Sequence, residues 1–190
     1  MSSVVSHLGP GELEAGLDNI RSAPKDVGSL DLIVRRPAVG IREELPEGEL
    51  DVDHGLVGDT WRMRSSRRTT DGSPHPDMQL NIMSSRVVAL VAQDKTRWAL
   101  AGDQLFVDLD LSEANLPAGT RLAIGDAIVQ VTDQPHTGCA KFVERFGLDA
   151  MKFVNSDLGR ELNLRGINAR VVQPGTIRVG DTVKRIPAVR

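Results

Sequence analysis

The sequence predicts a mainly β protein with short helices, folded as a closed or nearly closed β-barrel with helical decoration. Two observations carry this prediction. Many short segments alternate apolar and polar residues with the period of a strand, and Gly-Asp pairs separate several of them. The segments with helical periodicity are fewer and short. Many short strands with turn signals between them are typical of barrels, because closure removes the exposed edges of the sheet.

The length of 190 residues fits one domain with a modest extension, and the 40% of hydrophobic residues suffice for a core. We expect an N-terminal helical extension over residues 1–28, a barrel domain over residues 29–186 and a tail over residues 187–190. Within the extension, Leu13, Leu17 and Ile20 recur at helical spacing, and the pattern stops before a proline. This pattern predicts an amphipathic helix over residues 11–21 that docks on the barrel.

Period-2 patterns predict the strands of the barrel. Single strands are expected over residues 29–35, 105–111 and 169–172. Two hairpins are expected, one from residues 122–124 and 127–131, the other from residues 176–179 and 182–186. Gly-Asp pairs favour tight turns, because glycine tolerates positive φ and Asp bonds nearby backbone amides. The pairs are Gly58-Asp59, Gly102-Asp103, Gly125-Asp126 and Gly180-Asp181.

Helical patterns follow the strands at a few places. Ser84 or Ser85 is expected to cap a helix that runs to about residue 91. A second helix is expected to begin near Cys139, whose spacing to two phenylalanines at 142 and 146 is helical, and to end at Gly147. Short helices are expected over residues 150–154 and 158–162.

Composition excludes several classes of partner. The net charge of -3 provides no basic field for nucleic acid, and the 3% of aromatic residues provides no base-stacking platform. No apolar run reaches the length of a membrane span, and the first residues lack the pattern of a signal peptide. We therefore expect a cytoplasmic protein with no nucleic-acid or membrane partner, in keeping with its single cysteine.

That cysteine, Cys139, has two interpretations. Free cysteine is among the most buried residue types, and the predicted helical stripe would place Cys139 beside Phe142 and Phe146 in the core. In contrast, a loop enters a helix at Cys139, and both Lys141 and His136 are near in sequence, so that the thiolate form is favoured. A functional sulfur would act as a nucleophile, a sulfur carrier or a single metal ligand.

Other candidate groups are basic. Arg62 and Arg64 belong to a run of four arginines over residues 61–68, which suits phosphate but more often forms solvated surface. Arg165 stands between apolar residues and beside a glycine, which indicates either a charge aimed into a site or a buried ion pair. His136 lies three residues before the cysteine. Because this spacing rarely permits the hydrogen bond of a nucleophile pair, an ordinary surface histidine is favoured over a general base.

The order of these motifs resembles the MOSC domain, named for the C-terminus of molybdenum cofactor sulfurase. The matching segments are residues 55–59, 102–103, 116–119, 124–126, 136–142, 164–167 and 175–181. The resemblance extends from about residue 29 to residue 186. It implies a β-barrel with short helices, and it places on Cys139 the role of a persulfide carrier or of a ligand to the molybdenum of a bound pterin cofactor.

The resemblance also implies a cofactor of the molybdopterin type, and reductase-type members of the family reduce N-hydroxylated small-molecule substrates at the metal. The candidate cofactor-binding residues are Arg165, Lys141, Arg62, Arg64, His136 and Asp59, among which the basic side chains would be counter-charges for the pterin phosphate. Because the chain has no cysteine cluster for an iron–sulfur centre, we expect a separate electron-donor or sulfur-donor protein. Pyridoxal phosphate belongs to the family only through fused sulfurases and is not expected in this chain alone.

These expectations describe a molybdenum-cofactor-dependent oxidoreductase or a component of a sulfur transferase. Two other hypotheses stay open. One is a non-catalytic β-barrel module that binds an anionic small ligand or a partner, with a merely buried cysteine. The other is a cofactor-free thiol enzyme that uses Cys139 and His136.

Overall fold

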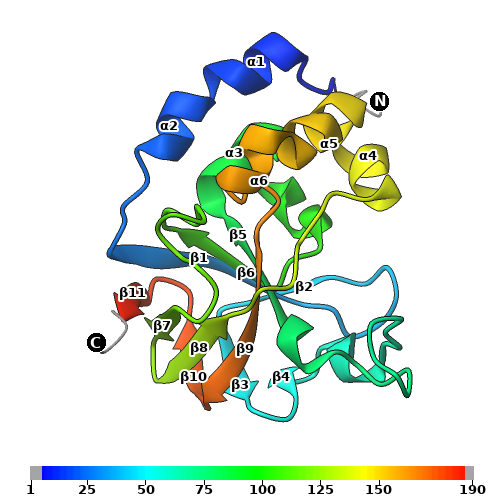
Figure 1. Ribbon diagram of the computed structural model, residues 1–190, viewed down its shortest axis with the longest axis vertical. Coiled ribbons are helices and arrows are strands. Elements are labelled where there is room, and N and C mark those ends of the chain that lie inside the picture. The colour runs from blue at the N-terminus through cyan, green and yellow to red at the C-terminus, as the bar shows by residue number, and fades with distance from the viewer. Residues whose placement is uncertain (1–5, 187–190) are drawn as a thin grey trace.

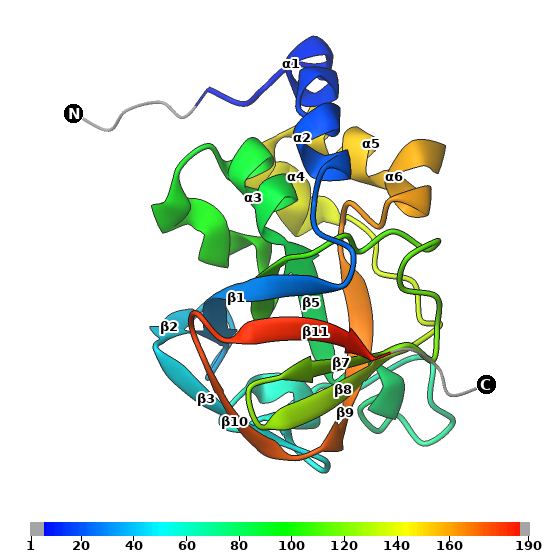
Figure 2. The same ribbon diagram turned by 90° about the vertical axis from the view of Figure 1, so that its left-hand side faces the viewer.

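A computed structural model gives the fold of the chain and describes residues 6–186, so that the expected tail lies outside the described residues. The strands of its large sheet are β1 (Val27–Arg35), β2 (Glu43–Leu45), β5 (Leu80–Ser84), β6 (Leu105–Asp108), β7 (Arg121–Ile124), β8 (Ala127–Val131), β9 (Ile167–Gln173) and β11 (Thr182–Ile186). Their order is β11-β7-β8-β9-β5-β6-β1-β2. An additional pairing of β11 with β1 closes the sheet into a barrel (Figure 2). The predicted closed barrel with short helices is confirmed.

The closure depends on strands that are distant in sequence. β1 pairs antiparallel with β11, with Ser29 opposite Thr182, and it pairs antiparallel with β6 at its other edge. β5 and β6 form a parallel pair, connected through a helix. Because no edge of the seven barrel strands is left without a neighbour, the barrel holds together the first and the last described strands of the chain.

One expected hairpin forms and the other does not. β7 and β8 pair directly across the turn at Gly125, as predicted. The second predicted hairpin is wrong, because β10 (Gly175–Arg178) joins a small sheet with β3 (Glu47–Asp51) and β4 (Gly55–Leu56), whereas β11 joins the barrel. Gly180, with φ of 94°, still makes a tight turn, and Asp181 accepts a hydrogen bond from the backbone of Arg178. The turn redirects the chain from one sheet to the other instead of folding it back on itself.

The helices lie together over one end of the barrel (Figures 1 and 2). They are α1 (Pro10–Ala15), α2 (Leu17–Arg21), α3 (Ser85–Ala92), α4 (Ala140–Phe146), α5 (Leu148–Asn155) and α6 (Asp157–Glu161). The chain also forms the 3-10 turns η1 (Thr60–Met63), η2 (Pro76–Met78) and η3 (Lys95–Ala101). The single helix expected over residues 11–21 is broken at Gly16, where a side chain would collide with Leu90 of α3. The other expected helices form within a few residues of their predicted bounds.

Two apolar clusters make up the core. One fills the barrel and includes Leu30, Leu105 and Val129, and the other lies between the barrel and the helices and includes Val34 and Phe106. Strands such as β1 contribute to both clusters, because successive side chains point to opposite faces. Over residues 6–186, no helix has both the length and the apolar character needed to cross a membrane.

Candidate functional site

Cys139 is exposed and lines a cavity of about 600 Å³ beside α4. It is the residue just before the helix, with an extended backbone at φ of -123° and ψ of -179°. The expected apolar stripe therefore begins without it, since Phe142 and Phe146 are buried while the cysteine is not. The predicted helical stripe began at Cys139, but the helix begins at Ala140. Cys139 therefore has an extended backbone, and its sulfur is exposed instead of packed in the core. Of the two interpretations of Cys139, the buried one is therefore wrong.

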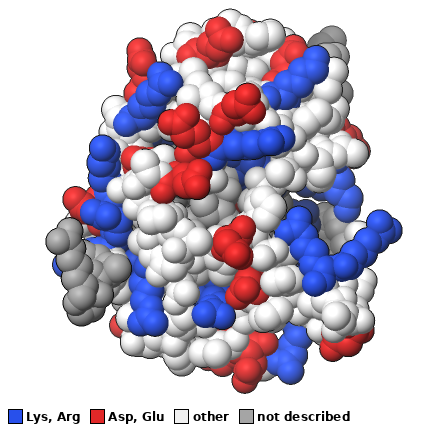
Figure 3. Space-filling model, viewed as in Figure 1, with Lys and Arg blue, Asp and Glu red and all other residues white. Residues whose placement is uncertain are grey.

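The cavity is strongly basic. Six of the side chains that line it are positively charged, namely Arg36, Arg42, Arg64, Lys141, Arg145 and Arg165. No Asp or Glu among the described residues lines it. The basic residues come from the loop after β1, from the end of η1, from α4 and from the segment before β9. In Figure 3, Lys and Arg side chains gather around a hollow on the right-hand side, where Figure 1 shows α4 and the loop after β1.

A buried ion pair fixes the first of these arginines. Arg36 Nη2 lies 2.7 Å from Asp59 Oδ2, and its Nε donates to Asp59 Oδ1 over 2.8 Å. The Arg36 and Asp59 side chains are 4% and 0% exposed. Burial alone would raise the pKa of Asp59, but the hydrogen bonds and the charge of Arg36 hold that pKa below its ordinary value. Arg36 also donates to the Gly102 carbonyl over 2.9 Å, so it connects two of the predicted Gly-Asp turns.

A second buried ion pair fixes Arg165. Its Nη1 donates to Asp103 Oδ2 over 2.7 Å, its Nη2 donates to the Ala101 carbonyl over 3.0 Å, and its guanidinium lies 5.1 Å from the ring centroid of Phe142. Burial raises the pKa of Asp103, and the charge of Arg165 opposes this effect. Both interpretations of Arg165 apply together, because it forms a buried ion pair and also lines the cavity.

His136 is not the surface histidine that the sequence favoured. Its side chain is only 13% exposed, and its Nδ1 lies 3.5 Å from Asp103 Oδ1. Within residues 6–186, neither of these two buried atoms makes a hydrogen bond. Burial, then the positive charges of Arg165 and Arg36, lowers the pKa of His136 well below its ordinary value, so the imidazole is neutral near pH 7. The loop before α4 folds over the barrel end instead of extending into solvent, and this placement buries the ring.

The structure brings five of the predicted site residues to one cavity: Cys139, Lys141, Arg64, His136 and Arg165. The other two lie elsewhere. Arg62 does not line the cavity and donates to the backbone carbonyl of Asp53 over 3.1 Å. Asp59 lies behind Arg36 and acts on the cavity only through that arginine.

Three further basic residues at the cavity were not predicted, namely Arg36, Arg42 and Arg145. The Gly58-Asp59 and Gly102-Asp103 pairs are the sequence features that relate to Arg36. The Asp59 carboxylate forms an ion pair with Arg36, and the Gly102 carbonyl accepts a hydrogen bond from it. Nothing in the sequence separates Arg42 or Arg145 from the exposed arginines of other loops and helices.

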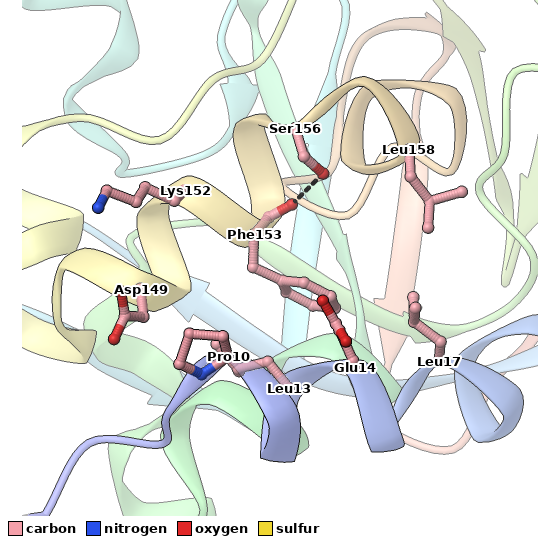
Figure 4. Close-up of a pocket in the computed structure, with 9 residues that line it drawn as sticks. All are labelled: Pro10, Leu13, Glu14, Leu17, Asp149, Lys152, Phe153, Ser156 and Leu158. Carbon is pink, nitrogen blue, oxygen red and sulfur yellow. Dashed lines mark hydrogen bonds between the residues drawn. The ribbon is translucent and has the colours of Figure 1, made fainter.

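A second cavity lies apart from this site. It has a volume of about 550 Å³ and separates α1 and α2 from α5 and α6, with Leu13, Leu17 and Phe153 facing one another across it (Figure 4). It shares no lining residue with the cavity at Cys139. Its walls are mainly apolar, and its described lining residues include no cysteine or histidine.

Comparison with known proteins gives a family and a fold. The model of the MOSC domain matches residues 73–184. The YUAD protein from Bacillus subtilis has a similar structure, with a TM-score of 0.64 and 15% sequence identity over 84% of this chain and 95% of that one. YiiM from Escherichia coli is similar with a TM-score of 0.54 and 21% identity over 85% and 71% of the two chains. No curated protein matches the chain significantly. At these identities the two structures support the barrel fold alone.

Proposed function

Because the chain belongs to the MOSC domain family, we propose that it binds the molybdenum cofactor and that Cys139 is the thiolate ligand of the metal. One observation carries this proposal. The only sulfur nucleophile of the chain is exposed beside a cavity lined by six basic side chains. A pterin cofactor with a phosphate group needs both features, a soft ligand for the metal and positive charge for the anion.

The charge of the cavity fits such a group. Two of the six basic residues are neutralised by Asp59 and Asp103. Within residues 6–186, the other four, Arg42, Arg64, Lys141 and Arg145, make no ion pair with a carboxylate. The excess of positive charge favours a ligand that carries more than one negative charge.

The metal-ligand chemistry also fits. Among the described residues, no three His, Cys, Asp or Glu side chains converge to hold a metal ion. The protein therefore offers one thiolate, and the remaining ligands would belong to the cofactor. When bound, the cofactor would supply two-electron chemistry at the metal. The residues of this chain would hold the metal through Cys139, hold the anionic part through the basic side chains and leave the open side of the cavity to a small substrate.

We propose an N-hydroxylated small molecule as that substrate, following the reductase-type members of the family. Its reduction to the amine and water consumes two electrons and two protons. A separate electron-donor protein would supply the electrons, since the single cysteine cannot ligate an iron–sulfur cluster. A free thiol suits a reducing compartment, and we propose that the protein works in the cytoplasm.

The exposure of Cys139 favours a second candidate function, that of a sulfur carrier. In this role the thiolate of Cys139 would attack the outer sulfur of a persulfide on a donor protein. The sulfur–sulfur bond of the donor would break as a new one formed on Cys139, and the donor would leave as a thiolate. The alternative of a thiol enzyme with His136 as base has less support. Within the described residues, Nδ1 of His136 has no hydrogen-bond partner, and it lies 3.5 Å from Asp103 Oδ1.

The proposal is tested by the metal content of protein made in a host that synthesises molybdopterin. We expect the wild-type protein to carry molybdenum and the Cys139→Ser variant to lose at least about nine-tenths of it, because a hydroxyl is a far weaker ligand for this metal than a thiolate. Mass spectrometry of the metal, normalised to protein, measures this. A persulfide carrier without metal would instead show a mass increase of one sulfur on the wild-type protein alone.

Met63 provides a matched control, because it is the other sulfur-containing residue that lines the cavity and it is exposed. Met63→Leu is expected to keep the metal. Equal molybdenum in the wild-type and Cys139→Ser proteins would refute the ligand role of Cys139.

A further inference from the structure

Two arginines converge on one point at the edge of the cavity. The point is the place where a side chain would begin at Gly102, a residue with φ of 89°. Arg42 Nη2 lies 3.6 Å from it and Arg145 Nη1 lies 3.7 Å from it. Apart from the two chain neighbours of the glycine, no other atom of the described residues comes within 4 Å. The glycine thus leaves an open space between two guanidinium groups that come from different parts of the fold.

Local contacts hold both guanidinium groups in place. Arg145 Nη1 donates to the Leu100 carbonyl over 2.5 Å, and Arg42 Nη1 donates to the Ile41 carbonyl over 2.7 Å. The backbone of Arg145 is held in turn by Arg97, whose Nη2 donates to the Arg145 carbonyl over 2.6 Å. These bonds use neutral carbonyl groups, and within residues 6–186 neither guanidinium forms an ion pair with a carboxylate.

The arrangement is unfavourable without a ligand. Burial, followed by the nearby charges of Arg145 and Arg36, lowers the pKa of Arg42. The Nε atom of Arg42 is buried and has no hydrogen-bond partner in the part of the chain that the structure describes. An unpaired buried donor and two converging like charges are costly, and an anion between them would relieve the repulsion.

We propose that Arg42 and Arg145 form an oxyanion subsite above Gly102, which takes a group of the phosphate class. Guanidinium groups bind such oxygens in well-defined directions, and two of them from different elements can hold two oxygens of a tetrahedral anion. The group could be the phosphate of the bound cofactor, an assignment that rests on the proposed function, or a free phosphate or phosphomonoester that binds to the protein on its own. Both sources have the same chemistry at this subsite.

The test uses inorganic phosphate and the full-length protein from a host that lacks molybdopterin. Phosphate is expected to raise the melting temperature of the wild-type protein in a saturable manner at constant ionic strength, since a ligand that binds only the folded state stabilises it. Arg42→Gln and Arg145→Gln are each expected to weaken the apparent affinity at least about 10-fold, because each removes a charge-assisted contact. Arg160→Gln is the control, since Arg160 is an exposed arginine of α6. The same phosphate response in all four proteins, or none in the wild type, would overturn the subsite.

A second arm identifies the source of the anion. If the group is the phosphate of the cofactor, Arg42→Gln and Arg145→Gln also carry less molybdenum when they are made in the molybdopterin-competent host. If it is a free anion, they keep their metal and lose only the phosphate response. Either result supports the subsite. Retention of metal by Cys139→Ser would contradict the proposed function while the phosphate response would still decide the subsite.

Discussion

Individual carboxylates determine how the basic residues of the cavity are held. Asp59 accepts hydrogen bonds from the backbone and side chain of Arg36 and from the backbone of Trp61, so each of its two oxygens accepts two of these hydrogen bonds. One oxygen of Asp103 accepts from Arg165, and the other has no hydrogen-bond partner among the described residues. Because both aspartates lie behind the arginines, they fix the position of the two guanidinium groups and neutralise only those two charges. The rest of the cavity stays positive.

The buried pair of Arg36 and Asp59 predicts a large effect of a single substitution. Asp59→Asn is expected to lower the free energy of unfolding by about 3–5 kcal/mol, because it leaves the Arg36 charge buried without a counter-charge. Denaturant unfolding measures the change. The matched control is Glu47→Gln, which removes the partner of Arg178 in a pair whose side chains are 56% and 53% exposed. This control is expected to cost no more than about 1 kcal/mol. Similar losses in the two variants would contradict the structural role of Asp59.

The segment that joins α6 to β9 brings the histidine and the second ion pair together. Gly166 lies in this segment with φ of 108°, next to Arg165. A side chain at Gly166 would collide with the Ile82 carbonyl of β5 and would lie 3.2 Å from His136 Nδ1. The close approach of this segment to β5 therefore depends on glycine, and with it the packing of His136 at the end of the barrel.

Gly166→Ala and Gly119→Ala test this packing as a pair. Both glycines have positive φ, at 108° and 93°, but no atom of residues 6–186 lies within 4 Å of where a side chain would begin at Gly119. Gly119→Ala is expected to lower the free energy of unfolding by about 1–2 kcal/mol, because alanine is strained in this backbone conformation. Gly166→Ala is expected to cost a further ~1–3 kcal/mol because of the collision. Thermal and denaturant unfolding measure both. Equal losses of unfolding free energy in the two variants would contradict a steric requirement for glycine at position 166 next to β5.

The molecule as a whole is a barrel with helices over one end (Figure 1). The basic cavity is lined by residues of both parts, from α4 and from the loops at the barrel end. The two apolar clusters meet across the barrel wall, so the barrel supports the helix that follows Cys139. This junction also buries charged groups and a histidine from five separate segments of the chain. The stability of the whole fold is therefore expected to depend on pH.

His136 sets the sign of this dependence. Its folded pKa lies well below the ordinary value of 6.5, so the unfolded chain takes up a proton as the pH falls through about 6.5 and the folded chain does not. The free energy of unfolding therefore has its full value above that pH with respect to this histidine. It decreases below that pH by up to about 1.4 kcal/mol per pH unit. Between pH 7 and pH 5.5, the free energy of unfolding of His136→Gln is expected to decrease less than that of the wild-type protein. Denaturant unfolding at each pH measures this difference.

The pH dependence of the wild-type protein alone cannot be assigned to His136, because Asp103 also titrates differently in the folded and unfolded states. Its raised pKa means that the folded state holds a proton more strongly than the unfolded state, which changes stability in the opposite direction as the pH falls. The difference between wild type and His136→Gln isolates the histidine. Identical slopes in the two proteins would contradict a buried neutral His136.

The sequence by itself determined most of the elements and the place of the sulfur at the start of a helix. Periodicity and turn chemistry act over a few residues, so β7, β8, α3 and α4 could be predicted from local patterns. The tertiary structure alone decided that β10 and β11 belong to different sheets and that Arg42 and Arg145 meet near Cys139. These outcomes depend on contacts between residues far apart in the chain. Such contacts follow from barrel closure and burial, which no local pattern of residues specifies.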